Sequence, residues 1–311
     1  MQRRILPMAQ EHMRLCLDFL LPREWSCVSF SEAFLDAAGK KSGGKRRAQV
    51  FLLAGQKQRQ KPEKKEPAGF RLDGILLLSP EGTLLHCLPE EICRDKSWKR
   101  ILRPFLRKQN VRAILGEEKA NRFLETACAG IFRHLRFHHA RYLLMRRQPG
   151  GKTGTAQDAA SAGKNSGMTA VLCGEQDTER LLPVQEAYES EEVLRGKGRP
   201  DRAKTRMRLR RTLRRQTVVA CTGPESGEIL GKAGTNAQGL HWQQIGGVFT
   251  RPDARNRGIA CFLVTELVRR AENRNKGSVL FVRPDNPAAI RVYGKCGFTL
   301  CGGFRSVWRR F

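Results

Sequence analysis

Long apolar runs are missing from this sequence: none approaches the ~18 residues that a membrane-spanning helix needs. The N-terminal segment has a basic start, but Glu11 and Asp18 interrupt its apolar stretch. We therefore interpret it as an amphipathic helix and not as a signal peptide. These features predict a cytoplasmic protein that does not associate with membranes.

Cysteine pairs at C-x-x-C spacing are also missing. The ten cysteines are scattered, and most lie among apolar residues, which indicates buried thiols in a reducing compartment. His134, His138 and His139 have a helical spacing that could suit a metal ion, but no further ligands gather near them in the sequence. A basic helix face explains these histidines better, so we expect no metal.

Acidic residues are scarce, with 30 Asp and Glu against 58 Lys and Arg and a formal charge of +28. Such a balance favours anionic partners (nucleic acid, acidic lipid or a polyphosphate ligand), although solvated basic faces explain it equally well. The stretch Arg195–Arg215 holds eleven basic residues against Asp201 alone. Aromatic residues make up only 7% of the chain, so any nucleic-acid contact there should be nonspecific, phosphate-driven and sensitive to salt.

A segment without large apolar residues, 148–167, divides the chain and predicts a flexible linker. It contains Gly151-Lys152-Thr153, the last part of a phosphate-binding P-loop pattern, but Arg146 stands where that pattern needs its first glycine. We interpret this match as chance. The expected organisation is an α/β domain over 1–147, the linker, and a second domain over 168–311.

The apolar patterns predict mixed helices and strands in both domains. In the first domain they indicate a helical region over 1–40, a strand over 48–55, a hairpin over 70–89, a helix over 96–108, a strand over 111–116, a helix after it and a strand over 141–145. In the second they indicate a strand over 168–173, a helix over 178–194, a hairpin over 217–234 and a loop over 235–243.

The pattern Arg255-x-x-Gly258-x-Ala260 lies between an expected strand, 244–250, and an expected helix, 259–274. Such a turn presents unpaired backbone N–H groups and the positive end of the helix dipole. Gly258 allows a phosphate to approach the backbone, and Arg251 and Arg257 add positive charge. The sequence therefore predicts an anion-binding site here.

A second strand, 278–282, is followed by Asn286, a suitable N-cap residue, and by Pro287 at the first helical position. Tyr293 lies two helical turns after Asn286 and on the same face, and Gly297-Phe298 ends the helix. A packed amphipathic tyrosine is the simpler explanation of Tyr293, but its place relative to the anion site suits a proton donor.

The segments VFTRPDARNRGIA and NPAAIRVYGKCGF together resemble the acetyl-CoA pyrophosphate motif and the C-terminal Asn-to-Tyr helix of the GNAT superfamily of acyl-CoA N-acyltransferases. The resemblance covers roughly 168–311 and is most specific over 244–298. It implies the α/β (α+β, mixed-sheet) GNAT fold. The segment KAGTNAQGLHWQQIGGVFT is similar to a branch in which a degenerate GNAT-like half precedes the working one, so two such halves in tandem are expected. Residues 1–147 lack both motifs and should not bind CoA.

The resemblance implies transfer of an acetyl group from acetyl-CoA to an amine by direct attack. Residues 246–250 would separate from 278–282 to admit the pantetheine arm, and the N–H of Val248 or Phe249 would polarise the thioester carbonyl. Tyr293 would protonate the departing thiolate, and Asn286 would brace the cofactor or the local backbone. The implied cofactor-binding set is Val248, Phe249, Thr250, Arg255, Asn256, Arg257, Gly258, Ile259, Ala260, Asn286 and Tyr293.

The general base and the acceptor remain open in the sequence. Glu189, Glu191 and Glu192 border the acceptor side in such folds and His241 precedes the key strand, but each is more typical of a solvated side chain. Cys261 and Cys296 are expected to be packing residues. The alternative hypothesis is a non-catalytic basic protein that binds RNA, DNA or acyl-CoA through a vestigial GNAT domain.

Overall fold

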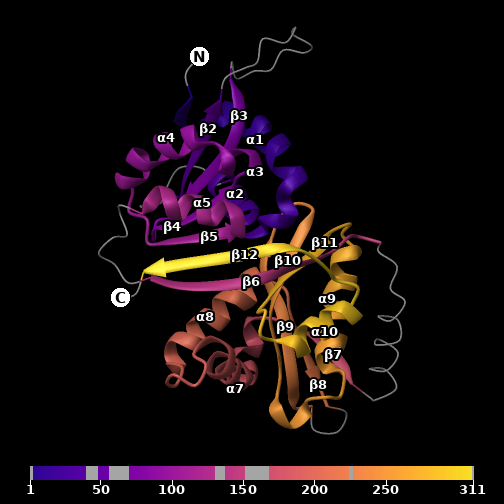
Figure 1. Ribbon diagram of the computed structural model, residues 1–311. Coiled ribbons are helices and arrows are strands. Elements are labelled where there is room, and N and C mark those ends of the chain that lie inside the picture. Colours follow the sequence, from indigo (N-terminus) through magenta and orange to yellow (C-terminus); the bar gives the residue numbers. More distant parts are fainter. Residues whose placement is uncertain are drawn as a thin grey trace. The chain divides into compact units, whose positions relative to one another are not determined.

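The computed structural model describes residues 3–39, 48–55, 70–129, 137–150, 168–223 and 227–309. The chain forms two compact units: unit 1 consists of Met1–Leu144 together with Cys301–Phe311, and unit 2 of Met145–Leu300 (Figure 1). These units differ from the expected domains because 145–147 group with unit 2 and 301–311 with unit 1. From 151 onward, the expected linker lies outside the described residues.

Unit 1 contains a mixed sheet in which neighbouring strands are antiparallel except for the pair β4–β5. The last strand of the chain, β12, belongs here because Phe304–Trp308 pair with Ala113–Glu117 of β5. Its second neighbour is β6 (Phe137–Arg147), where the Leu144 carbonyl accepts a hydrogen bond from the Cys301 thiol. The strand order up to β12 is β1 (Arg4–Pro7), β2 (Gln49–Gly55), β3 (Arg71–Leu78), β4 (Thr83–Cys87), β5 (Ala113–Glu117) and β12 (Thr299–Arg309).

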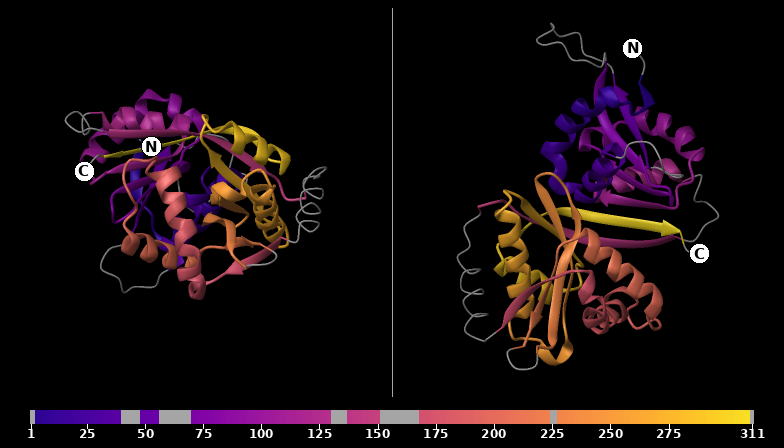
Figure 2. Two further views of the ribbon diagram at one scale, coloured as in Figure 1. Left: turned by 90° about the horizontal axis from the view of Figure 1, so that it is seen from below. Right: turned by 180° about the vertical axis from the view of Figure 1, so that it is seen from behind.

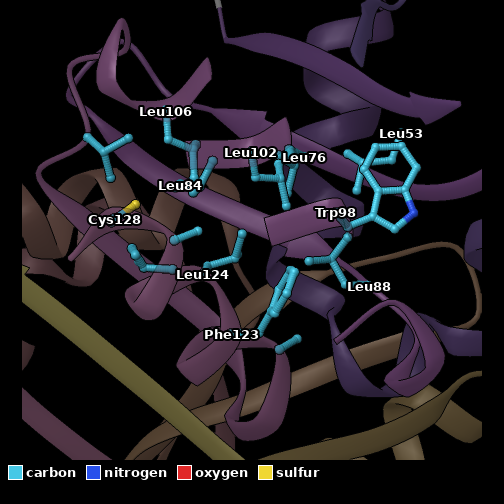
Figure 3. Packing of buried hydrophobic residues seen from close by; sticks show 14 of the residues in the cluster. Leu53, Leu76, Leu84, Leu88, Trp98, Leu102, Leu106, Phe123, Leu124 and Cys128 are labelled. Atoms are coloured by element: carbon cyan, nitrogen blue, oxygen red, sulfur yellow. The ribbon is translucent and has the colours of Figure 1, made fainter. Parts of the chain in front are cut away.

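Helices cover both faces of this sheet, and the alternation of β3 explains why. Ile75 and Leu77 pack against α1 (Met13–Leu20) and α2 (Val28–Gly39), whereas Leu76 and Leu78 point to the other face. There they meet α4 (Lys96–Arg107) and α5 (Glu118–Cys128), with Trp98 and Leu102 fully buried (Figure 3). The remaining short helices are η1 (Gln10–His12), η2 (Leu21–Ser26) and α3 (Glu90–Arg94).

Two expectations for secondary structure were wrong. The expected helical region 1–40 begins with strand β1, whose partner is β2, about 45 residues away in the sequence. The expected loop 235–243 is mostly strand: β9 (Ile229–Gln238) pairs with β10 (Trp242–Thr250), so only 239–241 connect them. In both cases the strand depends on a pairing partner rather than on its own propensity.

Unit 2 has a sheet with the order β11-β10-β9-β8-β7, in which only β10 and β11 are parallel. On one face, α7 (Thr178–Tyr188), the π-helical turn Glu189–Val193 and α8 (Arg202–Arg215) cover the sheet. On the other face lie α9 (Ile259–Glu272) and α10 (Pro287–Lys295) (Figures 1 and 2). The remaining elements are β7 (Thr169–Cys173), η3 (Glu175–Asp177), β8 (Val218–Thr222), η5 (Pro252–Ala254) and β11 (Gly277–Val282).

Helix α9 is the crossover between the parallel strands β10 and β11. Its first turn therefore begins where β10 ends, at the carboxyl edge of the parallel pair. In the part of the chain that the structure describes, no helix is long and apolar enough to cross a membrane.

Candidate functional site

Strands β10 and β11 pair along only part of their length. Their parallel register runs from Trp242 and Gly277 to Ile245 and Leu280 and ends there, although β10 continues to Thr250. Within these two fully described strands, 246–250 therefore have no register partner on β11. The two strands therefore stop pairing at the place where the family resemblance implied a separation.

A β-bulge lies in the same part of β10. Gly246 pairs with Gly234 of β9 and Phe249 with Lys232, so that Gly247 and Val248 together oppose the single residue Ala233. Gly247 adopts a positive φ of 59°, which favours glycine. The bulge turns the Gly247–Val248 peptide out of the regular ladder.

Lys232 lies beneath this bulge and was missed by the sequence analysis. Its side chain is 5% exposed, and its Nζ donates a hydrogen bond of 3.0 Å to the Gly247 carbonyl oxygen. The same Nζ lies 4.6 Å from the centre of the Tyr188 ring. Burial lowers the pKa of Lys232 to about 8, against the opposing effect of the Glu189 charge. The available signal was one lysine within the otherwise apolar or small run ILGKAG.

The predicted anion-binding turn opens helix α9 as expected from its sequence. Gly258 is the N-cap with φ 79° and ψ 1°, and Asn256 also has a positive φ of 64°. An added Cβ on Gly258 would meet nothing within 4 Å, so the backbone conformation alone calls for glycine here. Arg255 to Gly258 are exposed, and the N-cap residue has no side chain to occupy the first N–H groups of this 14-residue helix.

The arginine of this turn already has a carboxylate partner. Both Glu191 carboxylate oxygens lie 2.7 Å from Arg255 Nη2, and the Arg255 guanidinium also lies 5.8 Å from the Phe249 ring centre. Arg257 donates to the Asp253 carbonyl at 3.3 Å. In the absence of a ligand, the Glu191 carboxylate from the π-helical turn is therefore the anion beside Arg255.

Helix α10 carries the two other predicted residues. The Asn286 side-chain oxygen accepts a hydrogen bond of 3.0 Å from the Ala289 N–H, so Asn286 caps the helix and braces the local backbone. Tyr293 is 9% exposed and contacts Phe298 edge to face at 6.3 Å. Burial, reinforced by the nearby Tyr188, raises the pKa of Tyr293 well above its usual value, so the phenol keeps its proton at neutral pH.

The Thr250 hydroxyl lies at the end of the unpaired part of β10. Its Oγ1 is buried and has no hydrogen-bond partner among the described residues, although it lies at the end of β10. Buried polar atoms without a partner are uncommon because they lose their hydrogen bonds with water. A ligand along the unpaired part of β10 would supply the missing partner.

The open end of β10, the turn at Gly258 and helix α10 all lie within the segment that matches a known family. Residues 184–298 match the family model described as acetyltransferase (GNAT) family. This segment is a GNAT domain. A comparison with the curated proteins finds no significant match.

Three solved structures are similar over nearly the whole chain. A Drosophila protein is 12% identical, with 99% of each chain covered and a TM-score of 0.61. The GCN5-related glucosamine N-acetyltransferase region of a fungal multi-domain β-N-acetylglucosaminidase is 10% identical, with 98% of this chain and 38% of that chain covered and a TM-score of 0.50. A tandem GNAT protein from the clavulanic acid biosynthesis pathway is 12% identical, with 99% and 98% covered and a TM-score of 0.49. At these identities the similarity shows the fold, and the expected mixed α/β GNAT-like architecture is confirmed.

Two of the carboxylates considered as general bases, Glu189 and Glu191, already have hydrogen-bond or ion-pair partners. Glu189 is buried and accepts hydrogen bonds from Gln185, Thr205 and Arg208. Burial raises its pKa, but these hydrogen bonds outweigh burial and keep the pKa below its usual value. Glu191 pairs with Arg255. Both carboxylates therefore have structural partners.

His241 and Glu192 lie in different surroundings. His241 is exposed in the turn before β10, and at ~3.3 Å per residue it lies roughly 20 Å along the strand from Val248. Glu192 is close enough to Tyr293 for its charge to raise the tyrosine pKa. Among the candidate bases, Glu192 is thus the one whose charge acts on Tyr293.

Within the basic stretch 195–215, residues Arg202–Arg215 form helix α8, and carboxylates of η3, α7 and the π-helical turn neutralise much of its charge. Salt bridges join Arg202 to Glu186, Arg206 to Glu179 and Arg208 to Glu189, and Glu175 pairs with both Arg210 and Arg214. The spacing of these acids along α7 was not connected with α8 in the sequence analysis. No contact in the described part of the chain favours nucleic-acid binding by this helix.

The remaining candidates have packing roles where they are described. His138 stacks on Trp308, and His139 lies beside Arg305 and Glu125, while His134 lies outside the described residues. The described residues hold no group of three or more metal-ligating side chains. The Cys261 and Cys296 sulfur atoms are buried 3.1 Å apart between α9 and α10.

Proposed function

We propose that unit 2 transfers an acetyl group from acetyl-CoA to an amine. The observation that carries this proposal is the combination of the unpaired end of β10 with the uncapped, positive-φ turn that opens α9. The first offers backbone hydrogen-bonding groups to an extended ligand, and the second offers N–H groups and a helix dipole to its pyrophosphate.

The cofactor would lie along the residues inferred from the family resemblance. Its pyrophosphate would accept hydrogen bonds from the N–H groups of 255–260 and would compete with Glu191 for Arg255. Its pantetheine arm would follow 246–250, where the unpartnered Thr250 hydroxyl would gain a partner. Asn286 holds the first turn of α10 in place and is therefore assigned a bracing role.

The chemistry follows from the two groups on either side of the thioester. The acceptor amine attacks the carbonyl carbon, and the Val248 N–H stabilises the negative charge that develops on its oxygen. The new C–N bond forms as the C–S bond breaks, and the Tyr293 hydroxyl gives its proton to the departing thiolate. The proton lost by the amine restores the tyrosine through solvent. The raised pKa of Tyr293 supports its role as a donor rather than a base.

Calorimetric titration of acetyl-CoA into the full-length protein tests the cofactor site. Gly258→Asp places a carboxylate and a strained backbone at the phosphate position, and binding should become undetectable. Gly150→Asp is the matched control, because Gly150 also has a positive φ (67°) and open surroundings. It should bind as the wild type does. Absence of binding to the folded wild type, or equal binding to all three proteins, would refute the site.

A further inference from the structure

The buried Lys232 has no ion pair of its own in the described part of the chain. Its register partners are Ala220 on β8 and Phe249 on β10, so it faces the side of the sheet that α7 and α8 cover. Glu189 is the carboxylate whose charge acts on it, but Thr205 and Arg208 already donate to that carboxylate. Burying a lysine is costly unless it is hydrogen-bonded, and here the Gly247 carbonyl accepts that hydrogen bond.

The accepting carbonyl and the Val248 N–H belong to one peptide unit. The peptide is trans, since the structure shows no cis bond in the described chain, and in a trans peptide the C=O and N–H bonds point in opposite directions. With its oxygen held by Lys232, the N–H points away from Lys232. A charged donor on the oxygen also polarises the amide and makes its N–H a stronger hydrogen-bond donor.

We propose that Lys232 is a positioning residue for acyl transfer, which fixes and polarises the Gly247–Val248 peptide so that the Val248 N–H can stabilise the thioester oxyanion. This inference rests on the proposed function for the oxyanion, but the hold of Lys232 on the peptide stands on the geometry alone. The bulge explains why a side chain is needed: Gly247 and Val248 both oppose Ala233, so the regular β9 ladder does not fix them.

The protonation of Lys232 determines how its contribution to oxyanion stabilisation should change with pH. The groups that face it are the Tyr188 ring and Glu189 on the helical side, with Arg208 bound to that carboxylate and Arg255 over the neighbouring Phe249 ring. Below about pH 8 the ammonium polarises the peptide, and above it a neutral amine does so less. The contribution of Lys232 is therefore lost as pH rises. A general base would behave in the opposite way and gain activity as it loses its proton.

Selective isotope labelling allows the Gly247–Val248 peptide to be observed by NMR without overlap from other peptides. Gly-Val occurs once in the chain, at 247–248, so labelling with [1-¹³C]glycine and [¹⁵N]valine leaves a single ¹³C–¹⁵N peptide bond for NMR. In the ligand-free wild type, its carbonyl and amide resonances should shift with a midpoint near pH 8. They should not titrate in Lys232→Met, and in Lys232→Arg they should stay near the low-pH wild-type position. Wild-type resonances that do not titrate and are unchanged in Lys232→Met would overturn the proposal.

A second measurement tests the link to the thioester. The carbonyl resonance of bound [1-¹³C]acetyl-CoA should move downfield in the wild type and move less in Lys232→Met, while the dissociation constant changes by no more than about threefold. With a reactive amine, kcat should fall about tenfold at pH 7 with little change in the KM for acetyl-CoA, and Lys232→Arg should restore most of it. Lys197→Met, on the exposed surface, is the matched control.

The outcomes separate this inference from the proposed function. Acetyl-CoA binding with an equal carbonyl shift in wild type and Lys232→Met would overturn the role of Lys232 and leave the cofactor site standing. Failure of the wild type to bind acetyl-CoA would refute the proposed function and the catalytic part of this inference together. Loss of activity in both Lys232→Met and Lys232→Arg with unchanged peptide resonances would also overturn it.

Discussion

Units 1 and 2 each contain a parallel strand pair that is joined by a helical crossover. The two crossovers differ in whether a carboxylate lies at the N-terminus of the helix. In unit 2, α9 opens at Gly258, which has no side chain to cap it. In unit 1, α3 carries Glu90 and Glu91 in its first turn, and the Asp95 carboxylate accepts from the Ser97 N–H at the start of α4. A carboxylate at a helix N-terminus occupies the N–H groups and repels a second anion.

The strands that precede these helices differ in the same way. β10 runs five residues past its last pair with β11, from Ile245 to Thr250, whereas β4 ends at Cys87, two residues past its last pair with β5. The intervening residue, His86, is buried with its ring against Gly116, and burial lowers its pKa to about 4. A parallel strand pair with a helical crossover therefore does not by itself leave a helix start uncapped and a strand end unpaired. Unit 2 has both features, and the proposed anion site depends on them.

The largest effect should be on the stability of unit 1, and it should distinguish the buried core of that unit from its exposed last strand. Trp98 is fully buried in unit 1, and its Nε1 donates to the buried Asp73 carboxylate at 3.2 Å. Trp98→Ala should cost about 3–5 kcal/mol and lower the urea midpoint of unit 1, measured by circular dichroism. Trp308→Ala, at a site 39% exposed, should cost much less. Similar losses in both variants would show that the Trp98 core does not dominate unit 1.

A smaller effect should appear at Tyr293 and be confined to turnover. Tyr293→Phe keeps the ring and its contact with Phe298 but removes the proton donor. We expect kcat to fall on the order of 10²-fold, with the dissociation constant for acetyl-CoA nearly unchanged by calorimetry. Tyr142→Phe in unit 1 is the matched control and should leave both values as they are. Full turnover in Tyr293→Phe would exclude its assigned role.

The smallest effect should come from the carboxylate that occupies the anion turn. Glu191→Gln removes the competitor for Arg255, so acetyl-CoA should bind about two- to fivefold more tightly at low salt, with the gain reduced at high salt. Glu179→Gln removes an exposed carboxylate that pairs with Arg206 on α8 and should have little effect on binding. Weaker binding in Glu191→Gln would mean that this pair holds the turn in its binding conformation.

Local features of the candidate site could be predicted from the sequence because each depends on a few neighbouring residues. The turn at Gly258 follows from glycine at a helix start, and the Asn286 cap follows from Asn-Pro before a helical run. The hairpin over 70–89 in unit 1 was also predicted from neighbouring residues, and β3 and β4 form it. These features need no knowledge of distant chain segments.

The features that were missed depend on residues far apart in the sequence. Lys232 meets the Gly247 carbonyl only after β9 and β10 pair, and it meets Tyr188 only after α7 covers the sheet. The sequence suggested that the arginines of α8 form an unpaired basic face. In the structure, α7 packs beside α8 and its acidic side chains pair with these arginines. β12 joins unit 1 because its backbone pairs with β5, more than 180 residues earlier in the chain.

The sequence by itself therefore determined most of the helices and strands, the glycine turn that opens α9 and the helix that carries Tyr293, because backbone preference and capping act over a few residues. Only the tertiary structure decided which strand ends stay unpaired, which charges neutralise each other and which peptide Lys232 holds. Those outcomes follow from burial and strand register, which bring together groups that no local pattern connects.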